Sequence, residues 1–234
     1  MPTLKTLKPD VLTIGTYFVN PPFEFIENNE RVGFEVDLME EICRRLDINA
    51  EFVHTRWEVI LDEMMAHHYD AIIGGITITA ERQKTLNYST PFMDTTLSIV
   101  INQEKTPELK SLTDLKKHTV GVQAATTGLD AANLMKSKGL ITNIEIYPFA
   151  NIQDAMKDLV AGKIGAVIKV FPVADYLVKH NPSLKILMPV PDDPQPLGIG
   201  FHKDDTDLLQ RINQILADMK QDGGYDKIYR KWFK

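Results

Sequence analysis

The sequence predicts an α/β fold in which one kind of unit, a mainly parallel sheet with helices, occurs twice along the chain. Short apolar strand patterns alternate with amphipathic helix patterns from residue 11 to residue 168, and this alternation is typical of parallel sheets. The apolar positions of the two halves also match, since Ile60 corresponds to Ala155 and Ile73 to Ile168 at a constant offset of 95. The two halves are therefore predicted to be variants of one α/β unit.

The first half begins with a strand, a helix and a second strand. We expect these elements at residues 11–15, 35–46 and 51–54, and a further helix and strand at 59–65 and 71–73. Pro21 and Pro22 lie between the first strand and the first helix. Because proline lacks a backbone donor and restricts its neighbour, this stretch is predicted to be a loop without a regular ladder.

The second half repeats the pattern and is followed by a C-terminal helical region. Strands are predicted at residues 119–122, 144–146, 166–168 and 197–201, and helices at 128–137, 153–161, 208–219 and 225–233. The Pro-rich segment of residues 188–196 predicts a break before the last strand. Gly223 and Gly224 are expected to end the long helix.

Composition excludes several classes of function. The 234 residues carry 26 basic and 32 acidic side chains, a net charge of −6, which offers no basic face for a nucleic acid. No segment approaches the roughly 20 apolar residues that cross a bilayer. Residues 1–10 lack the apolar core of a signal peptide, so we expect either a cytosolic chain or a mature form from which the signal peptide has been removed. The single cysteine, Cys43, is expected to be a buried, inert thiol.

The segment most informative about function is Gly74-Gly-Ile-Thr-Ile-Thr-Ala-Glu-Arg82. Glycines at the end of a strand allow close approach to the backbone, threonines supply hydroxyls, and Arg82 carries a planar fork of donors suited to a carboxylate. The segment predicts a recognition site for a small acid. The alternative is a turn in which Thr79 caps a short helix and Arg82 is a solvated surface charge.

Five motifs in this order carry a resemblance to a known family. They are Pro21-Pro-Phe-Glu-Phe25, Val32-Gly-Phe-Glu-Val-Asp-Leu38, the segment ending in Arg82, Val120-Gly-Val-Gln-Ala-Ala-Thr-Thr-Gly128 and Gln221-Asp-Gly-Gly-Tyr-Asp-Lys-Ile-Tyr-Arg-Lys-Trp-Phe233. Together they closely resemble the polar amino-acid-binding family of ABC-transporter solute-binding proteins, over nearly the whole chain.

This resemblance implies the type II periplasmic binding protein fold, with two Rossmann-like α/β lobes joined by a two-stranded hinge. Lobe 1 would comprise residues 1–96 and 196–234, lobe 2 residues 97–195, and the crossovers would lie near 95–99 and 191–197. The implied function is to bind a small carboxylate ligand in an interlobe cleft and to deliver it to an ABC permease. An amino acid is the favoured class of ligand. We therefore expect a periplasmic monomer that needs no cofactor or metal and performs no catalysis.

Family positions also imply a set of ligand-binding residues. These are Arg82, Thr77, Gly75, Trp57, Tyr17, Asn20, Thr126, Thr127 and Asp94. In the family pattern, Arg82 binds the ligand α-carboxylate together with Thr77 and backbone amides around Thr127. The carbonyl of Gly75 faces the ligand ammonium, and Trp57 is an aromatic platform, with a core residue in the first helical turn as the alternative.

Three positions depart from the family pattern. Relatives of the cationic amino-acid type carry an acid at Tyr17 and an aromatic residue at Asn20, and the family usually places an aspartate for the ligand ammonium where this chain has Lys169-Val170. A buried ammonium without a carboxylate is costly. Three explanations stay open. Another acid replaces the aspartate, with Asp94 as the first candidate and Glu24 as a weaker one. Alternatively, the ligand is a carboxylate without an ammonium, or the site has lost its ancestral ligand.

Two other functions stay open. The chain could be the ligand-sensing domain of a receptor, or a periplasmic enzyme resembling cyclohexadienyl dehydratase, which would need a general acid that Val170 cannot supply. A metal site is not expected, because His67 and His68 are neighbours that cannot face one another on a helix, and the other four histidines are scattered along the sequence.

Overall fold

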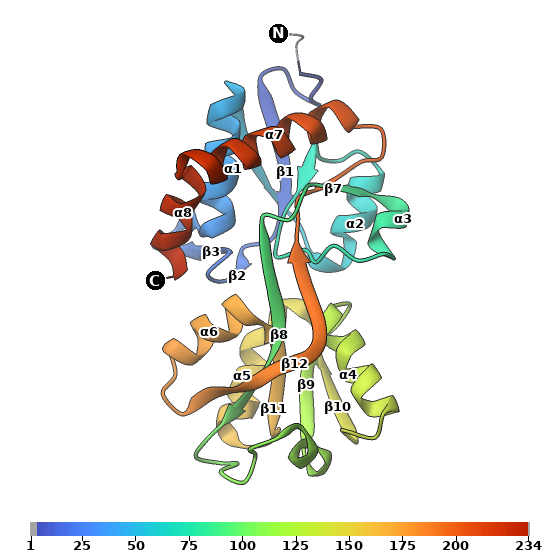
Figure 1. The fold of residues 1–234 in the computed structure, drawn as a ribbon, viewed down its shortest axis with the longest axis vertical. Coiled ribbons are helices and arrows are strands. Elements are labelled where there is room, and N and C mark those ends of the chain that lie inside the picture. Colours follow the sequence, from blue (N-terminus) through green and yellow to red (C-terminus); the bar gives the residue numbers. More distant parts are fainter. Residues whose placement is uncertain (1–3, 234) are drawn as a thin grey trace. The chain divides into compact units, whose positions relative to one another are not determined.

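The computed structural model describes residues 4–233, and the chain divides into two compact units (Figure 1). Unit 1 is formed by Met1–Asp94 and Pro196–Lys234, and unit 2 by Thr95–Gln195. Residues 1–3 and 234, which the sequence analysis placed in the first lobe, lie outside the described residues. The chain thus passes from one unit to the other twice.

Unit 1 is built on a five-stranded sheet. Its order is β5 (Asn49–His54), β1 (Val11–Thr16), β6 (Ala71–Ile72), β13 (Gly200–Phe201) and β7 (Asn87–Tyr88). Strand β1 pairs in parallel with β5 and β6, whereas β13 pairs antiparallel with β6 and β7. The apolar run that predicted β1 is the centre of this sheet, and its Leu12 and Ile14 are fully buried.

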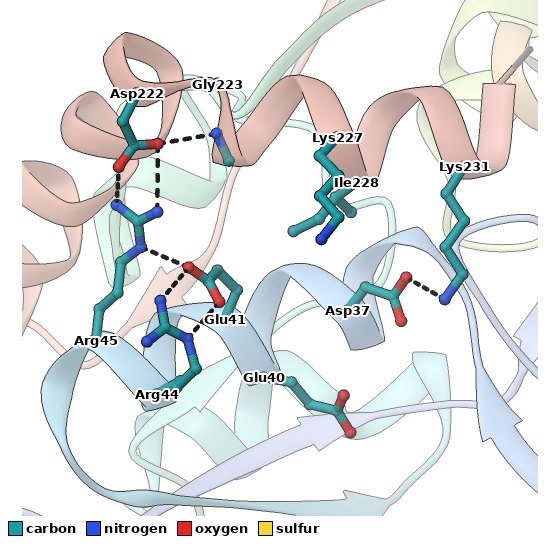
Figure 2. Close-up of a pocket in the computed structure, with 11 residues that line it drawn as sticks. Asp37, Glu40, Glu41, Arg44, Arg45, Asp222, Gly223, Lys227, Ile228 and Lys231 are labelled. Carbon is teal, nitrogen blue, oxygen red and sulfur yellow. Dashed lines mark hydrogen bonds and ion pairs between the residues drawn. The ribbon is translucent and has the colours of Figure 1, made fainter.

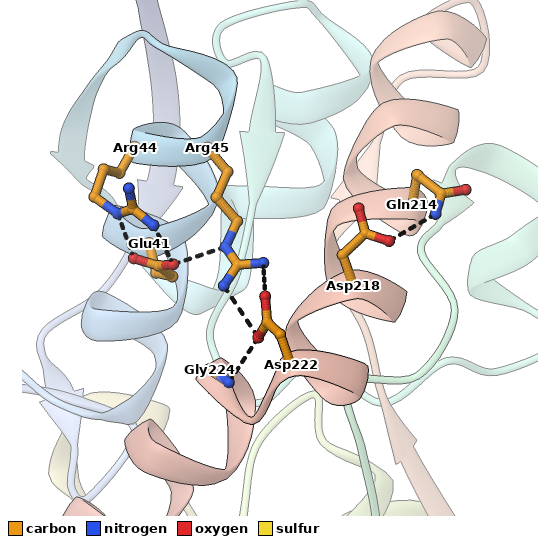
Figure 3. Close-up of polar contacts among 7 residues, drawn as sticks. All are labelled: Glu41, Arg44, Arg45, Gln214, Asp218, Asp222 and Gly224. Carbon is orange, nitrogen blue, oxygen red and sulfur yellow. Dashed lines mark hydrogen bonds and ion pairs between the residues drawn. The ribbon is translucent and has the colours of Figure 1, made fainter.

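Five helices belong to unit 1. They are α1 (Phe34–Leu46), α2 (Trp57–Met65), α3 (Arg82–Thr85), α7 (Thr206–Asp222) and α8 (Gly224–Phe233). Helices α7 and α8 come last in the sequence, yet they lie beside α1, which comes near its beginning (Figure 1). Arg45 of α1 joins them, because Nη1 binds Asp222 Oδ2 at 2.7 Å while Nε binds Glu41 Oε1 at 2.7 Å (Figure 3). The C-terminal helices therefore belong to the first unit, and α7 contributes buried residues to its core whereas α8 contributes none.

A small antiparallel sheet lies where the sequence predicted a loop. Its strands are β2 (Val19–Asn20), β3 (Glu24–Glu27) and β4 (Glu30–Val32). Pro21 and Pro22 occupy the turn between β2 and β3, so they interrupt no ladder bond. The prediction of an irregular stretch was wrong on either side of the proline pair, because these strands are too short and too polar to show a period of two.

Unit 2 repeats the topology of unit 1. Its sheet order is β10 (Asn143–Tyr147), β9 (Thr119–Gln123), β11 (Ala166–Val170), β8 (Met93–Asn102) and β12 (Leu184–Leu197). As in unit 1, the first three strands are parallel and the fourth is antiparallel to the third. Ile14 pairs with Ala71 in unit 1 and Val120 pairs with Ala166 in unit 2. The offset of 95 seen in the sequence thus links equivalent sheet positions.

Helices cover both faces of the second sheet. They are η1 (Leu112–Lys117), α4 (Thr127–Ser137), η2 (Phe149–Asn151), α5 (Ile152–Ala161) and α6 (Phe171–Lys179). Ala132 of α4 packs with Ile99, whereas Ala155 of α5 packs with the next residue of β8, Val100. Successive strand residues point to opposite faces, so α4 lies on one side of the sheet and α5 on the other.

The Pro-rich segment 188–196 is not a break. It lies within β12, which is the last strand of the unit 2 sheet. An edge strand tolerates proline because one of its sides has no ladder partner to lose. The strand predicted at 197–201 is correspondingly divided, since β12 ends at Leu197 and β13 begins at Gly200. Between residues 4 and 233, no helix is long and apolar enough to cross a bilayer.

Candidate functional site

Arg82 is held at the start of α3 by groups of unit 1. Its Nη1 donates to the carbonyl oxygen of Thr77 at 2.8 Å, and its guanidinium carbon lies 5.0 Å from the centroid of the Trp57 ring. The hydroxyl of Thr79 accepts a hydrogen bond from the Arg82 amide at 3.2 Å. The capping contact of the alternative interpretation is therefore present, but the arginine is half-buried and stacked on an indole.

Trp57 serves as both a core residue and an aromatic surface for Arg82. It is the first residue of α2 and only 7% of it is exposed. Its ring meets the Tyr17 ring edge-on, with centroids 5.9 Å apart. The indole is thus fixed by packing on one side, which holds the plane on which the Arg82 guanidinium rests.

The glycine pair that follows β6 allows a very close approach of side chains to the backbone. Gly74 and Gly75 have φ angles of +157° and +59°, which side-chain-bearing residues rarely adopt. A Cβ atom at Gly74 would lie 2.8 Å from the Tyr17 ring, and one at Gly75 would lie 3.2 Å from Asn20 Nδ2. The Tyr17 hydroxyl donates to the Gly74 carbonyl oxygen. Tyr17 and Asn20 therefore border the same short backbone segment.

Two buried carboxyl groups lie behind this segment, and sequence reasoning found only one of them. Glu24 on β3 is 1% exposed and Glu35 on α1 is fully buried. Glu35 Oε1 accepts the Gly75 amide at 2.8 Å, and the Glu24 carboxyl lies close enough to influence the pKa of Glu35. Burial raises the pKa of Glu35 to about 7.

The same carboxyls influence Tyr17. Burial raises the pKa of the Tyr17 phenol, and the charges of Glu24 and Glu35 raise it further, while Arg82 lowers it. The phenol therefore stays protonated and remains a donor to the Gly74 carbonyl. Tyr17, Asn20, Trp57, Gly75, Thr77 and Arg82 are thus brought together in unit 1, with Glu35 orienting the peptide of Gly75.

In unit 2, Thr126 and Thr127 form the start of α4. Thr126 is the N-cap, and its hydroxyl accepts the Leu129 amide at 3.3 Å. The Thr127 hydroxyl donates to Gln195 Oε1 at 2.8 Å, and Gln195 is 2% exposed. The amides of a first helical turn attract an anion. Gln195, which sequence reasoning missed, fixes the side chain of one of these residues.

Lys169 and Val170 end β11 at the position of the family's aspartate. Lys169 is 7% exposed, and its Nζ donates to Gln123 Oε1 at 2.5 Å and lies 5.3 Å from the centroid of the Phe149 ring. Val170 is the N-cap of α6 and makes no side-chain capping bond. This end of the strand therefore presents an ammonium and an apolar side chain instead of a carboxylate.

Of the two substitute acids, Asp94 is exposed, whereas Glu24 is buried. The negative charge of Asp94 contributes to the raised pKa of Tyr225 in α8, after the larger effects of burial, Tyr229 and Asp226. Glu24 interacts electrostatically with Tyr17 and influences the pKa of Glu35. The described contacts thus associate Glu24 with the Tyr17 region and Asp94 with the C-terminal helix.

A separate groove lies between α1 and the C-terminal helices of unit 1 (Figure 2). Its charged side chains bind one another, as Arg44 and Arg45 bind Glu41, and Lys231 Nζ binds Asp37 Oδ2 at 2.7 Å. Exposed ion pairs of this kind fix side chains but offer little binding energy to a ligand. The groove is therefore a structural contact between helices.

Residues 12–234 match the family described as bacterial extracellular solute-binding proteins, family 3. The chain belongs to this family. It is 31% identical over 227 residues to the ABC transporter arginine-binding protein 1 of Escherichia coli (strain K12), which covers 95% of the chain and 90% of that protein. The family that the five sequence motifs suggested is thereby confirmed.

Solved structures of the family have the same fold. An ancestral arginine-binding protein bound to arginine is 34% identical, with a TM-score of 0.87, over 96% of this chain and 99% of that one. The ancestral amino acid-binding protein AncCDT-1, a precursor of cyclohexadienyl dehydratase, is 33% identical, with a TM-score of 0.85, over 96% of each chain. These similarities confirm the predicted type II binding-protein fold.

Proposed function

We propose that this solute-binding protein takes up an amino acid by its α-carboxylate and delivers it to an ABC permease in the periplasm. The observation that carries the proposal is the fixed position of Arg82 on the Trp57 ring and the Thr77 carbonyl. A guanidinium has five donors in a rigid fork, and a preset fork loses less entropy on binding a carboxylate.

The proposed ligand class is α-amino acids, with arginine and glutamine as the first candidates. The similar E. coli protein is named for arginine, and the ancestral arginine-binding protein has also been solved with glutamine at 34% identity and a TM-score of 0.85. The Tyr17 phenol stands where cationic-type relatives carry an acid. We therefore expect a weaker preference for a cationic side chain than those relatives have, because a phenol supplies no negative charge.

The test is calorimetric titration with L-arginine, L-glutamine and L-histidine, each beside its deaminated analogue. A ligand concentration 100 times the dissociation constant should also stabilise the folded protein by about 2.7 kcal/mol. Binding of an amino acid that is lost in its deaminated analogue supports an amino-acid function. Equal binding of the two identifies a carboxylate receptor that ignores the ammonium, and binding of neither across the amino acids and small organic acids contradicts the proposal.

One comparison favours a second candidate function. AncCDT-1 is a precursor of cyclohexadienyl dehydratase, so a chain of this fold stands close to an enzyme. Such a reaction needs a general acid placed against the substrate, and β11 ends in Lys169 and Val170. Incubation with prephenate or arogenate, followed by detection of the aromatic product, decides between the two. Catalytic turnover would replace the binding function with an enzymatic one.

A further inference from the structure

His67 and His202 lie against each other on the surface of unit 1. Their ring centroids are 3.4 Å apart, with an interplanar angle of 35°. The topology explains the contact, because β13 pairs antiparallel with β6 at Gly200 and Ile72. Residues that follow β13 therefore return beside those that precede β6. His202 is one of the four histidines that are scattered along the sequence, and the sheet brings it beside His67.

The backbone at His67 has the conformation that usually calls for glycine. Helix α2 ends at Met65, and His67 adopts φ +57° just beyond it. The amides of His67 and His68 donate back to the carbonyls of Met64 and Glu63 at 3.0 Å each. This is the ordinary way to close a helix, with glycine as the preferred residue at the left-handed position. A histidine at this position places an imidazole side chain where the backbone conformation favours glycine.

Asp204 completes a three-residue cluster. The side chains of His67, His202 and Asp204 each offer a ligand atom, and these atoms all lie within 4.8 Å of one another. The Asp204 amide donates to Nδ1 of His202 at 3.2 Å, so the backbone of this turn helps to position the His202 ring. Neutral imidazole is the form that binds metals. Among the described residues 4–233, this is the group of side chains with metal-ligand chemistry.

We propose that His67, His202 and Asp204 form a surface binding site for a divalent transition-metal ion such as Zn²⁺. Two imidazoles and one carboxylate suit Zn²⁺, Ni²⁺ or Cu²⁺ better than Mg²⁺ or Ca²⁺, which prefer oxygen ligands. Tetrahedral zinc with ligands at about 2.0–2.2 Å needs ligand atoms about 3.3 Å apart. The ligand atoms lie within 4.8 Å of one another, and we expect them to reach this spacing by side-chain rotation, because His67 is exposed and the Asp204 side chain is 83% exposed.

The surroundings are mixed in charge. A groove at this surface is lined by Asp204, Asp205 and Asp207, and also by Lys5 and Arg211. The three carboxylates exceed the two cations, so the local field favours a cation. An ion held here would join the α2–β6 connection to the β13–α7 connection. Binding should therefore stabilise unit 1 against unfolding, because a site that exists only in the folded state adds its binding energy to stability.

The experiment uses the untagged, full-length protein after treatment with a chelator. Calorimetric titration with ZnCl₂ should give one site per chain, and thermal unfolding should shift upward with Zn²⁺ but not with Mg²⁺. The His67→Asn and His202→Gln variants should each weaken Zn²⁺ binding about tenfold or more. Asparagine also tolerates the left-handed conformation, so His67→Asn isolates the loss of the ring from backbone strain.

His68→Asn is the matched control, because His68 is exposed, adjacent to His67 and outside the cluster. It should bind Zn²⁺ as the unmodified protein does. Loading with Co²⁺ supplies a second measurement that does not depend on protein stability. Nitrogen ligands change the visible absorption spectrum of the ion. The proposal is overturned if Zn²⁺ shows no saturable site, or if His67→Asn and His202→Gln bind it as tightly as His68→Asn does.

Discussion

The guanidinium of Arg82 rests on the indole of Trp57, with 5.0 Å between the guanidinium carbon and the ring centroid. The Thr77 carbonyl fixes one end of the guanidinium at 2.8 Å. A long, flexible side chain is thus held in one place before any ligand arrives. For a binding protein, this arrangement converts a mobile charge into a positioned one, which reduces the entropy lost on binding.

Replacing Arg82 with methionine should abolish most carboxylate binding while leaving the fold intact. A charge-assisted hydrogen bond contributes about 1.5–3 kcal/mol net, which corresponds to a loss of about 10- to 100-fold in affinity. Methionine can still pack on the Trp57 ring, so little stability should be lost. Arg56→Met is the control, because Arg56 is exposed and directly precedes Trp57. Titration of the bound amino acid measures both, and equal affinities would remove Arg82 from the site.

Replacing Gly74 with alanine should destabilise unit 1 because the new methyl group meets the Tyr17 ring. The Cβ atom would lie 2.8 Å from that ring, a clash of the kind that costs about 1–3 kcal/mol. Gly139→Ala is the matched control, since Gly139 also has a positive φ, +71°, but nothing within 4 Å of its Cβ position. Chemical denaturation of the two variants separates clash from backbone strain. Equal losses of unfolding free energy in the two variants would show that the Tyr17 ring moves aside without a measurable cost.

The fold was predictable wherever a buried strand or an amphipathic helix dominates its own segment. Strand β1 and helix α7 appeared in the sequence as an apolar run and as a helical period. Strand β12 did not, because its prolines are tolerated only through its place at the sheet edge. Local sequence carries propensity, whereas an edge position is a property of the assembled sheet.

The candidate site divides in the same way. The motif ending in Arg82 marked the segment that we propose binds the ligand carboxylate, and the family resemblance implied the other positions. Glu35 and Gln195 were missed because their importance lies in burial and in partners far away in sequence, Gly75 and Thr127. A glutamate or glutamine ordinarily lies at the surface. Only the folded structure shows that these two do not.

The Glu35 carboxyl should make stability fall as pH rises between about 4.5 and 7. Its pKa in the folded protein is raised from 4.5 to about 7, so the folded state holds a proton that the unfolded state has released in this window. Stability then decreases with pH, by up to about 3 kcal/mol in total, and levels off above pH 7. Glu35→Gln removes this term and should be relatively more stable at high pH.

The measurement is the free energy of unfolding of both proteins at several pH values, compared as a difference so that other groups cancel. Glutamine can still accept the Gly75 amide through its side-chain oxygen, so that contact survives the change. Glu58→Gln, at an exposed position in the first turn of α2, controls for the loss of one carboxylate. A pH-independent difference between Glu35→Gln and the unmodified protein would contradict the raised pKa.

Replacing Val170 with aspartate should restore the acid that this chain lacks and sharpen recognition of the ligand ammonium. Val170 is the N-cap of α6 and has no capping side chain, so aspartate should also stabilise the helix by about 0.5–2 kcal/mol. Val170→Asn separates the two effects, because asparagine caps a helix about as well but carries no charge.

Only Val170→Asp should increase the preference for an amino acid over its deaminated analogue, by about tenfold or more, since a carboxylate compensates the cost of burying an ammonium. Paired titrations of the two ligands with each variant provide the measurement, and the thermal stability of both variants reports the helix cap. If Val170→Asp and Val170→Asn show the same ligand preference, then the ligand ammonium does not approach the end of β11, and another acid such as Glu24 must face it.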